Sequence, residues 1–288
     1  MNPYTRTLTE VRADGKLLFH TFLPLPGHNL YRIKDVRVYQ TPQTATPCST
    51  NALAISPFPA NSLAIATTAG MLAVAETETG LQVEQHRTPS HMLAVAALTP
   101  NVFVGGCRDG AVLLYDTRTH GHALRLRHAS SVVSLRCPDP HRIVAAGLHS
   151  KLDMYDLRAC GPVGHEGKAT RSYLAYEGYK NMDHPGLGFD VSASLGLVAA
   201  ASSDGKLRLF ELWTGKEVEA GWGPNKRWED YGYSGDSTFR PRLPMSPWPV
   251  RVVEFVGSAG SQEAGRWNPA ALLVVVGSTF EEWKWEGA

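Results

Sequence analysis

The chain has 288 residues, with 28 basic and 27 acidic side chains and a net charge of +1. Its hydrophobic fraction of 43% can fill a core, which excludes global disorder, and its balanced charge offers no broad basic field for nucleic acid. No apolar run reaches the 18 residues of a membrane span, and the first residues lack the apolar core of a signal peptide. We therefore expect a protein of the cytoplasm or nucleus, with no membrane partner and no direct nucleic-acid partner.

The first 45 residues contain three β-like runs, at Tyr4–Arg12, Lys16–Leu23 and Asp35–Gln40. Two arrangements are open for them. They can form an irregular or partial first sheet over 1–45, or one run can pair with the last strand of the chain and so remove an exposed edge.

From residue 52 onward, short apolar runs separated by turn residues predict units of up to four strands each. The expected strands are Ala52–Ser56, Ser62–Thr67, Met71–Glu76 and Leu81–His86; Leu93–Leu98, Val102–Gly106, Ala111–Asp116 and Ala123–Arg127; Val132–Cys137, Arg142–Gly147, Lys151–Asp156 and a strand near Ser172–Glu177; Gly188–Ala193, Leu197–Ser202, Lys206–Glu211 and Glu217–Ala220; and Val250–Phe255, Ala271–Val276 and Thr279–Trp285.

Two of these units nearly copy each other about 40 residues apart, at Val102–Arg118 and Arg142–Arg158. Each has an apolar strand, a tight polar turn, an alternating strand and a closing Tyr-Asp-x-Arg. A period near 40 residues with four short strands per unit is typical of a β-propeller. We predict an all-β propeller over the single domain 1–288, with six blades, or seven as the alternative. Loop insertions are expected at 159–172 and 221–248.

The second strand of each unit is a continuous run of small apolar residues, whereas the third alternates. The first pattern predicts a strand covered on both faces by neighbouring blades, and the second predicts a strand with less complete cover. Asp109-Gly110 and Asp204-Gly205 between these strands favour tight hairpin turns.

The sequences Tyr115-Asp-Thr-Arg118 and Tyr155-Asp-Leu-Arg158 resemble the signature of WD repeats, with tyrosine in place of tryptophan. Two consecutive repeats that end in Asp-x-Arg resemble the substrate-receptor subunits of cullin-4 ubiquitin ligases. The stretch Tyr176-Glu-Gly-Tyr179 followed by Leu197–Leu212 is similar to the fourth member of that receptor group. The third repeat departs from the pattern, because Phe210-Glu-Leu-Trp213 has neither the aspartate nor the arginine.

The resemblance implies a non-catalytic receptor that docks to the ligase adaptor, damage-specific DNA-binding protein 1, and recruits a protein substrate to the cullin-4 complex. The residues that match the docking motif are Asp116, Arg118, Asp156 and Arg158. On the opposite face, near the turns between second and third strands, Arg108, His149 and Ser203 are candidates for binding the target. The alternative is a generic scaffold in another assembly, such as ribosome maturation or chromatin complexes, in which each aspartate only caps its turn.

The sequence contains no recognisable catalytic motif. Gly161–Lys168 has the look of a phosphate-binding loop, but its glycine spacing is off by one and Ala169 replaces the hydroxyl that would hold magnesium. The 11 histidines and four cysteines show no paired ligand spacing. We predict no enzyme activity, no metal and no cofactor, and we expect all four cysteines to be reduced.

Overall fold

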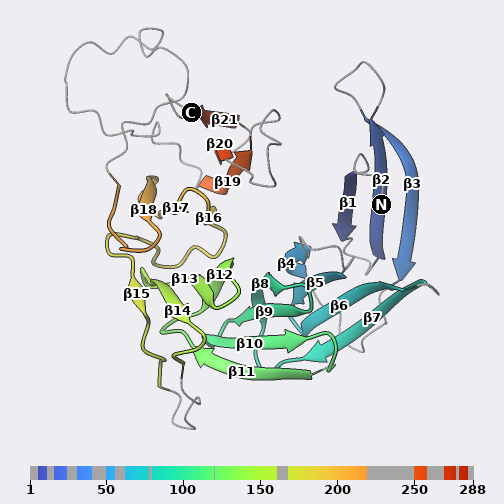
Figure 1. Ribbon diagram of the computed structural model, residues 1–288, viewed down its shortest axis with the longest axis horizontal. Helices are drawn as coiled ribbons and strands as arrows, with labels where there is room; N and C mark the ends of the chain where they lie inside the picture. Colours follow the sequence, from blue (N-terminus) through green and yellow to red (C-terminus); the bar gives the residue numbers. More distant parts are fainter. Residues whose placement is uncertain are drawn as a thin grey trace.

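The computed structural model describes the backbone of residues 6–11, 16–24 and 31–40, and then residues 50–55, 62–77, 80–119, 121–160, 168–218, 250–257, 269–276 and 279–284. All regular secondary structure in these ranges is β-strand, arranged as six antiparallel sheets. The sheets follow one another in chain order around a common centre, from β1–β3 at the right of Figure 1 to β19–β21 at the top.

Within each sheet the strands run in sequence order, each antiparallel to the next. The first sheet consists of β1 (Arg6–Val11), β2 (Lys16–Pro24) and β3 (Tyr31–Gln40). The second consists of β4 (Thr50–Ile55), β5 (Ser62–Thr67), β6 (Gly70–Thr77) and β7 (Gly80–Arg87). The third consists of β8 (Met92–Thr99), β9 (Val102–Cys107), β10 (Ala111–Asp116) and β11 (Gly121–Arg127).

The remaining sheets continue the same order. The fourth consists of β12 (Val132–Asp139), β13 (Arg142–Gly147), β14 (Leu152–Asp156) and the short β15 (Leu174–Ala175). The fifth consists of β16 (Phe189–Ser192), β17 (Leu197–Ala201) and β18 (Leu207–Glu211). The sixth consists of β19 (Val250–Gly257), β20 (Pro269–Val276) and β21 (Thr279–Lys284).

The expected strands are present in the described ranges, with two changes at the outer positions. The strand near Ser172–Glu177 shrinks to β15, and Glu217 makes only an isolated bridge to Phe210 where Glu217–Ala220 was expected. The three N-terminal runs pair with one another as a sheet of their own. The 221–248 insertion lies outside the described residues, and the number of blades stays a prediction.

The hydrophobic cores lie between neighbouring sheets. Val104 and Val112 of the third sheet pack with Ile143 and Tyr155 of the fourth. The innermost strands β4, β8, β12, β16 and β19 contact one another in succession. The third, fourth and fifth sheets bury both faces against their neighbours, and their second strands of small apolar residues are buried, as expected from their composition.

The tyrosines that replace the signature tryptophan are buried but keep a partner for the hydroxyl. Tyr115 donates to Glu84 Oε2 of β7 at 3.1 Å, and the Tyr155 hydroxyl lies 2.8 Å from Nδ1 of His128. Burial lowers the pKa of His128 to about 4, so its imidazole is neutral near pH 7. Each tyrosine hydrogen bond links the third strand of a sheet to the segment that comes before the first strand of that sheet.

No helix long and apolar enough to span a membrane occurs among the described residues.

The close approach of the third and fourth sheets leads to a prediction for Gly106→Ala. A Cβ added there would lie 2.4 Å from Cγ1 and 2.8 Å from Cβ of Val132, a branched side chain with little freedom to move. We expect the substitution to lower the free energy of unfolding by about 1–3 kcal/mol, measured by urea denaturation. Gly121→Ala is the control, since its added Cβ would meet nothing closer than 3.7 Å and should change stability by less than about 0.5 kcal/mol. Equal losses in the two variants would contradict this account of the packing.

Candidate protein-binding rim

The two Asp-x-Arg motifs occupy equivalent turns in neighbouring sheets. Asp116 ends β10 and Asp156 ends β14, and in each case the arginine stands two residues later in the turn that leaves the third strand. The N–H groups of Thr117 and Leu157, between Asp and Arg, donate to carbonyls in the turns between the first two strands of their own sheets. The repeats therefore place both motifs on the same rim of the propeller.

In the first motif the carboxylate of Asp116 holds the guanidinium of Arg118 with two bonds. Nε donates to Oδ1 at 3.0 Å and an Nη2 hydrogen to Oδ2 at 2.6 Å, while the backbone N–H of Arg118 donates to Oδ1 at 2.9 Å. These bonds from Arg118 lower the pKa of Asp116 to about 2. The arginine side chain is 67% exposed, so its remaining N–H groups face solvent.

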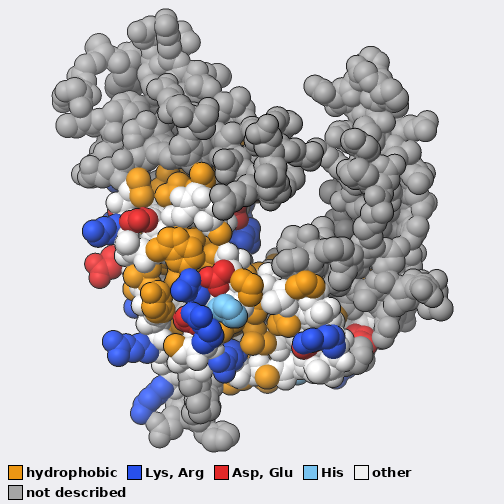
Figure 2. Space-filling view, in the orientation of Figure 1, with side chains coloured by type: hydrophobic (Ala, Val, Ile, Leu, Met, Phe, Trp, Pro, Cys, Tyr) orange, Lys and Arg blue, Asp and Glu red, His pale blue; other side chains and the backbone are white. Residues whose placement is uncertain are grey.

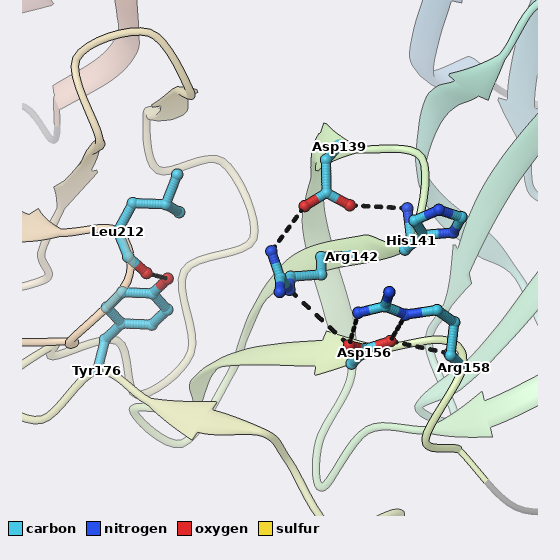
Figure 3. Close-up of polar contacts among 7 residues, drawn as sticks. All are labelled: Asp139, His141, Arg142, Asp156, Arg158, Tyr176 and Leu212. Carbon is cyan, nitrogen blue, oxygen red and sulfur yellow. Dashed lines mark hydrogen bonds and ion pairs between the residues drawn. The ribbon is translucent and has the colours of Figure 1, made fainter.

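The second motif repeats this geometry almost bond for bond. Arg158 donates to Asp156 through Nε at 3.0 Å, Nη2 at 2.7 Å and its backbone N–H at 2.9 Å (Figure 3). The same bonds hold the pKa of Asp156 well below its usual range. Each aspartate thus caps its turn and positions its arginine at the same time.

A third arginine joins this rim from the second strand of the same sheet. Arg142 starts β13, where it pairs in register with Asp156, and its Nη1 donates to Asp139 at 3.0 Å. Its Nε also lies 3.9 Å from Asp156 Oδ2, and Figure 3 shows Arg142 between the two carboxylates. Figure 2 shows side chains of both charges gathered with hydrophobic ones over the region of β12–β14. The rim is therefore built from paired charges rather than from a free basic cluster.

The third repeat, which lacks the Asp-x-Arg motif, keeps the same backbone arrangement. Leu212 N–H donates to the Gly196 carbonyl at 2.7 Å, as Leu157 N–H does to the His141 carbonyl at 2.7 Å. Trp213 follows Leu212 and so takes the rim position that Arg158 holds in the preceding repeat. The repeat pattern of the sequence showed that the arginine is missing here, but it did not indicate that the exposed indole of Trp213 lies on the rim.

The three residues expected to bind a target are exposed and lie at the other end of the third strands. Arg108 sits between β9 and β10, His149 between β13 and β14, and Ser203 between β17 and β18. The turn of His149 is linked to Met182, a residue that is 61% exposed and whose carbonyl accepts the His149 N–H at 3.3 Å. Met182 is a surface hydrophobic residue of this face that the repeat pattern did not single out.

The His149 turn is strained. His149 and Ser150 both have positive φ, 53° and 57°, where two other repeats place glycine after aspartate. Bonds to the 180–182 segment hold the turn: Ser150 N–H donates to the Asn181 carbonyl at 2.7 Å, and Asn181 N–H donates to Ser150 Oγ at 3.2 Å. Left-handed conformations cost about 1–2 kcal/mol for residues other than glycine, so the neighbouring loop supports this turn against its local preference.

Metal or thiol chemistry has no evident site in the described residues. No group of three or more His, Cys, Asp or Glu side chains is placed to hold a metal ion there. Cys107, Cys137 and Cys160 are free, and burial raises the pKa of each thiol, to about 12 for the first two. Cys48 lies outside the described residues.

Sheets of antiparallel strands that follow one another around a centre confirm the predicted fold class, an all-β propeller, and the repeated Asp-x-Arg turns are similar to those of WD-repeat proteins. The chain is 24% identical over 215 residues to WD repeat-containing protein 21 of Schizosaccharomyces pombe. That match covers 73% of this chain and 47% of the relative, so the chain spans about half the length of that protein. No protein-family model matches.

Two solved structures share the fold at low sequence identity. The structure of U3-55K has a TM-score of 0.62 at 13% identity, covering 96% of this chain and 73% of that one. The computationally designed Ika8 protein has a TM-score of 0.58 at 15% identity, covering 96% of this chain and 68% of that one. Similarity to a WD repeat-containing protein and to these two structures supports the fold class.

The lowered aspartate pKa values predict how stability changes in acid. A carboxyl whose pKa is lower in the folded than in the unfolded state stabilises the fold above its ordinary pKa of 3.8, and this contribution is lost as pH falls toward about 2. The stability difference between wild type and Asp116→Asn/Asp156→Asn should therefore shrink between pH 5 and pH 2. Urea midpoints across this range measure it, with Glu177→Gln as a control for lost charge. A constant difference would contradict the stabilising role of the two carboxylates.

The strained turn predicts opposite effects of glycine at two target-face positions. His149→Gly removes the left-handed cost and should raise the free energy of unfolding by up to about 1 kcal/mol. Ser203→Gly, at a position without positive φ in the equivalent turn of the next sheet, should lower it by about 0.5–1 kcal/mol, because glycine only adds freedom to the unfolded chain. Thermal and urea unfolding measure both, and a loss of stability in His149→Gly would show that the turn is not strained.

Proposed function

We propose that this chain is a non-catalytic scaffold that serves as a substrate receptor of a cullin-4 ubiquitin ligase. Asp116, Arg118, Asp156 and Arg158 would dock to the ligase adaptor, damage-specific DNA-binding protein 1. The observation that carries the proposal is the duplicated Asp–Arg pair, with matching bond lengths in two neighbouring sheets and both arginines mostly exposed.

The geometry suits recognition of a protein surface. In each motif the carboxylate takes up Nε and one Nη2 hydrogen, and the other N–H groups of the planar guanidinium are directed outward. Such groups bind carboxylate or carbonyl oxygens and stay charged when partly desolvated. Two equivalent arginines in successive repeats would therefore offer two spaced donor sets to one partner.

The two rims would bind different partners. The Asp-x-Arg rim would hold the adaptor, and the opposite rim, with Arg108, His149 and Ser203, would hold the protein substrate. Binding both at once raises the effective concentration of substrate lysines near the ubiquitin-charged enzyme, without any chemistry in the propeller itself.

A generic scaffold in another assembly is the second candidate. The observation in its favour is that each aspartate also accepts the backbone N–H of its arginine, a bond that shapes the turn whether or not a partner binds. Affinity purification of the wild-type chain separates the two. Enrichment of the adaptor and cullin-4 supports the receptor, and a partner set without them supports the other scaffold.

The docking role predicts the behaviour of Arg118→Ala/Arg158→Ala. Loss of both guanidinium groups should weaken binding of the purified adaptor by at least tenfold, roughly the effect of losing one interface hot spot. Biolayer interferometry measures the affinity, and urea unfolding checks that the variant is folded.

Arg108→Ala is the matched control, because Arg108 is an exposed arginine at the other end of the third strand and bonds through its backbone. Its affinity should equal that of wild type. Unchanged binding by a folded Arg118→Ala/Arg158→Ala would reject the role of the motifs, and absence of binding by the wild type would reject the receptor itself.

A further inference from the structure

The third repeat places an aromatic side chain where its two predecessors place arginine. Backbone bonds from Leu157 and Leu212 to the preceding turns fix this equivalence, so Trp213 stands at the rim position of Arg158. Glu211, in the place of the aspartate, uses its carboxylate to accept the Thr214 hydroxyl at 2.5 Å. The local turn is therefore complete without any bond to the indole.

Trp213 remains 42% exposed, and Tyr173 beside the same arginine is 60% exposed. Both are among the few large hydrophobic side chains that the described surface leaves open. Tryptophan and tyrosine with an arginine between them are the residue types that dominate binding energy at protein interfaces.

Arg142 joins this aromatic pair to the second docking motif. Its guanidinium carbon lies 5.1 Å from the centre of the Trp213 ring and 5.8 Å from that of Tyr173, within range of cation–π attraction. The same guanidinium pairs with Asp139 and lies near Asp156, which holds Arg158. One connected set of side chains thus runs from Arg158 to Trp213 across two neighbouring sheets.

We propose that Trp213, flanked by Tyr173 and oriented by Arg142, is an apolar anchor for the same adaptor that binds Arg118 and Arg158. This inference rests on the proposed function and extends it from two repeats to three. The partner surface would present oxygen acceptors to the two arginines and an apolar recess to the indole.

Two observations favour this occupant over others. The anchor continues the rim that carries the docking motifs, whereas the candidate target face lies at the other end of the strands. The arginines next to it are matched by Asp139 and Asp156, which leaves little excess positive charge for the phosphates of a nucleic acid.

The test compares adaptor affinities of Trp213→Ala, Trp213→Phe and Tyr173→Ala with that of the wild type. We expect Trp213→Ala to bind at least tenfold more weakly, as for a central aromatic hot spot, and Trp213→Phe to stay within about threefold. Tyr173→Ala should fall between them, and it keeps the test decisive if Trp213→Ala proves unstable in urea unfolding. Met182→Ala, which removes an exposed hydrophobic residue of the opposite rim, should bind like the wild type.

Salt separates the two parts of the surface. The loss of affinity in Trp213→Ala should persist between 50 and 500 mM salt. The loss in Arg118→Ala/Arg158→Ala should shrink, because salt screens exposed charges by shortening the Debye length, to roughly 3 Å at 1 M. If Trp213→Ala and Tyr173→Ala bind with wild-type affinity while the arginine variant binds more weakly, the anchor role of Trp213 is rejected and the receptor role is not. Absence of binding by the wild type overturns the anchor and the receptor together.

Discussion

The close contact of neighbouring sheets is the constraint from which the remaining structure follows. The third, fourth and fifth sheets bury both faces against their neighbours, so the interior of each second strand carries small or apolar side chains. Where two sheets come nearest, as at Gly106 against Val132, even a methyl group has no room. The turns at the two ends of the strands form the two rims on which polar binding residues can be placed.

Repeated backbone hydrogen bonds fix which residues lie at the surface of the rim. An N–H after the third strand meets a carbonyl in the turn between the first two strands in each of three repeats, so the residue that follows always reaches the same rim. What stands there differs: arginine held by aspartate in two repeats, and tryptophan beside Arg142 in the third. A uniform scaffold thus displays different chemistry at equivalent positions.

The repeat pattern contained enough information to predict the strands, because burial on both faces and tight turns leave a signal within a few residues. Ser62–Thr67, Ala111–Asp116 and Arg142–Gly147 were predicted to the residue. The four rim residues of the Asp-x-Arg motifs could also be placed on one rim, since each depends only on its own turn. The role of Arg142 could not, because it arises from an aspartate in the next strand and an indole in another repeat. The strained turn at His149 was hidden for a similar reason, since the 180–182 segment that supports it is distant in sequence.

The local pairing of each arginine with the aspartate two residues before it also bears on entropy. A free arginine carries about 2 kcal/mol of side-chain rotamer entropy, part of which is lost when a partner fixes it. In Arg118 and Arg158, two guanidinium bonds to a carboxylate of the same turn restrict those rotamers before any encounter. A partner would meet donors already oriented, so its affinity would depend less on ordering these side chains and more on how well its own acceptors match their spacing.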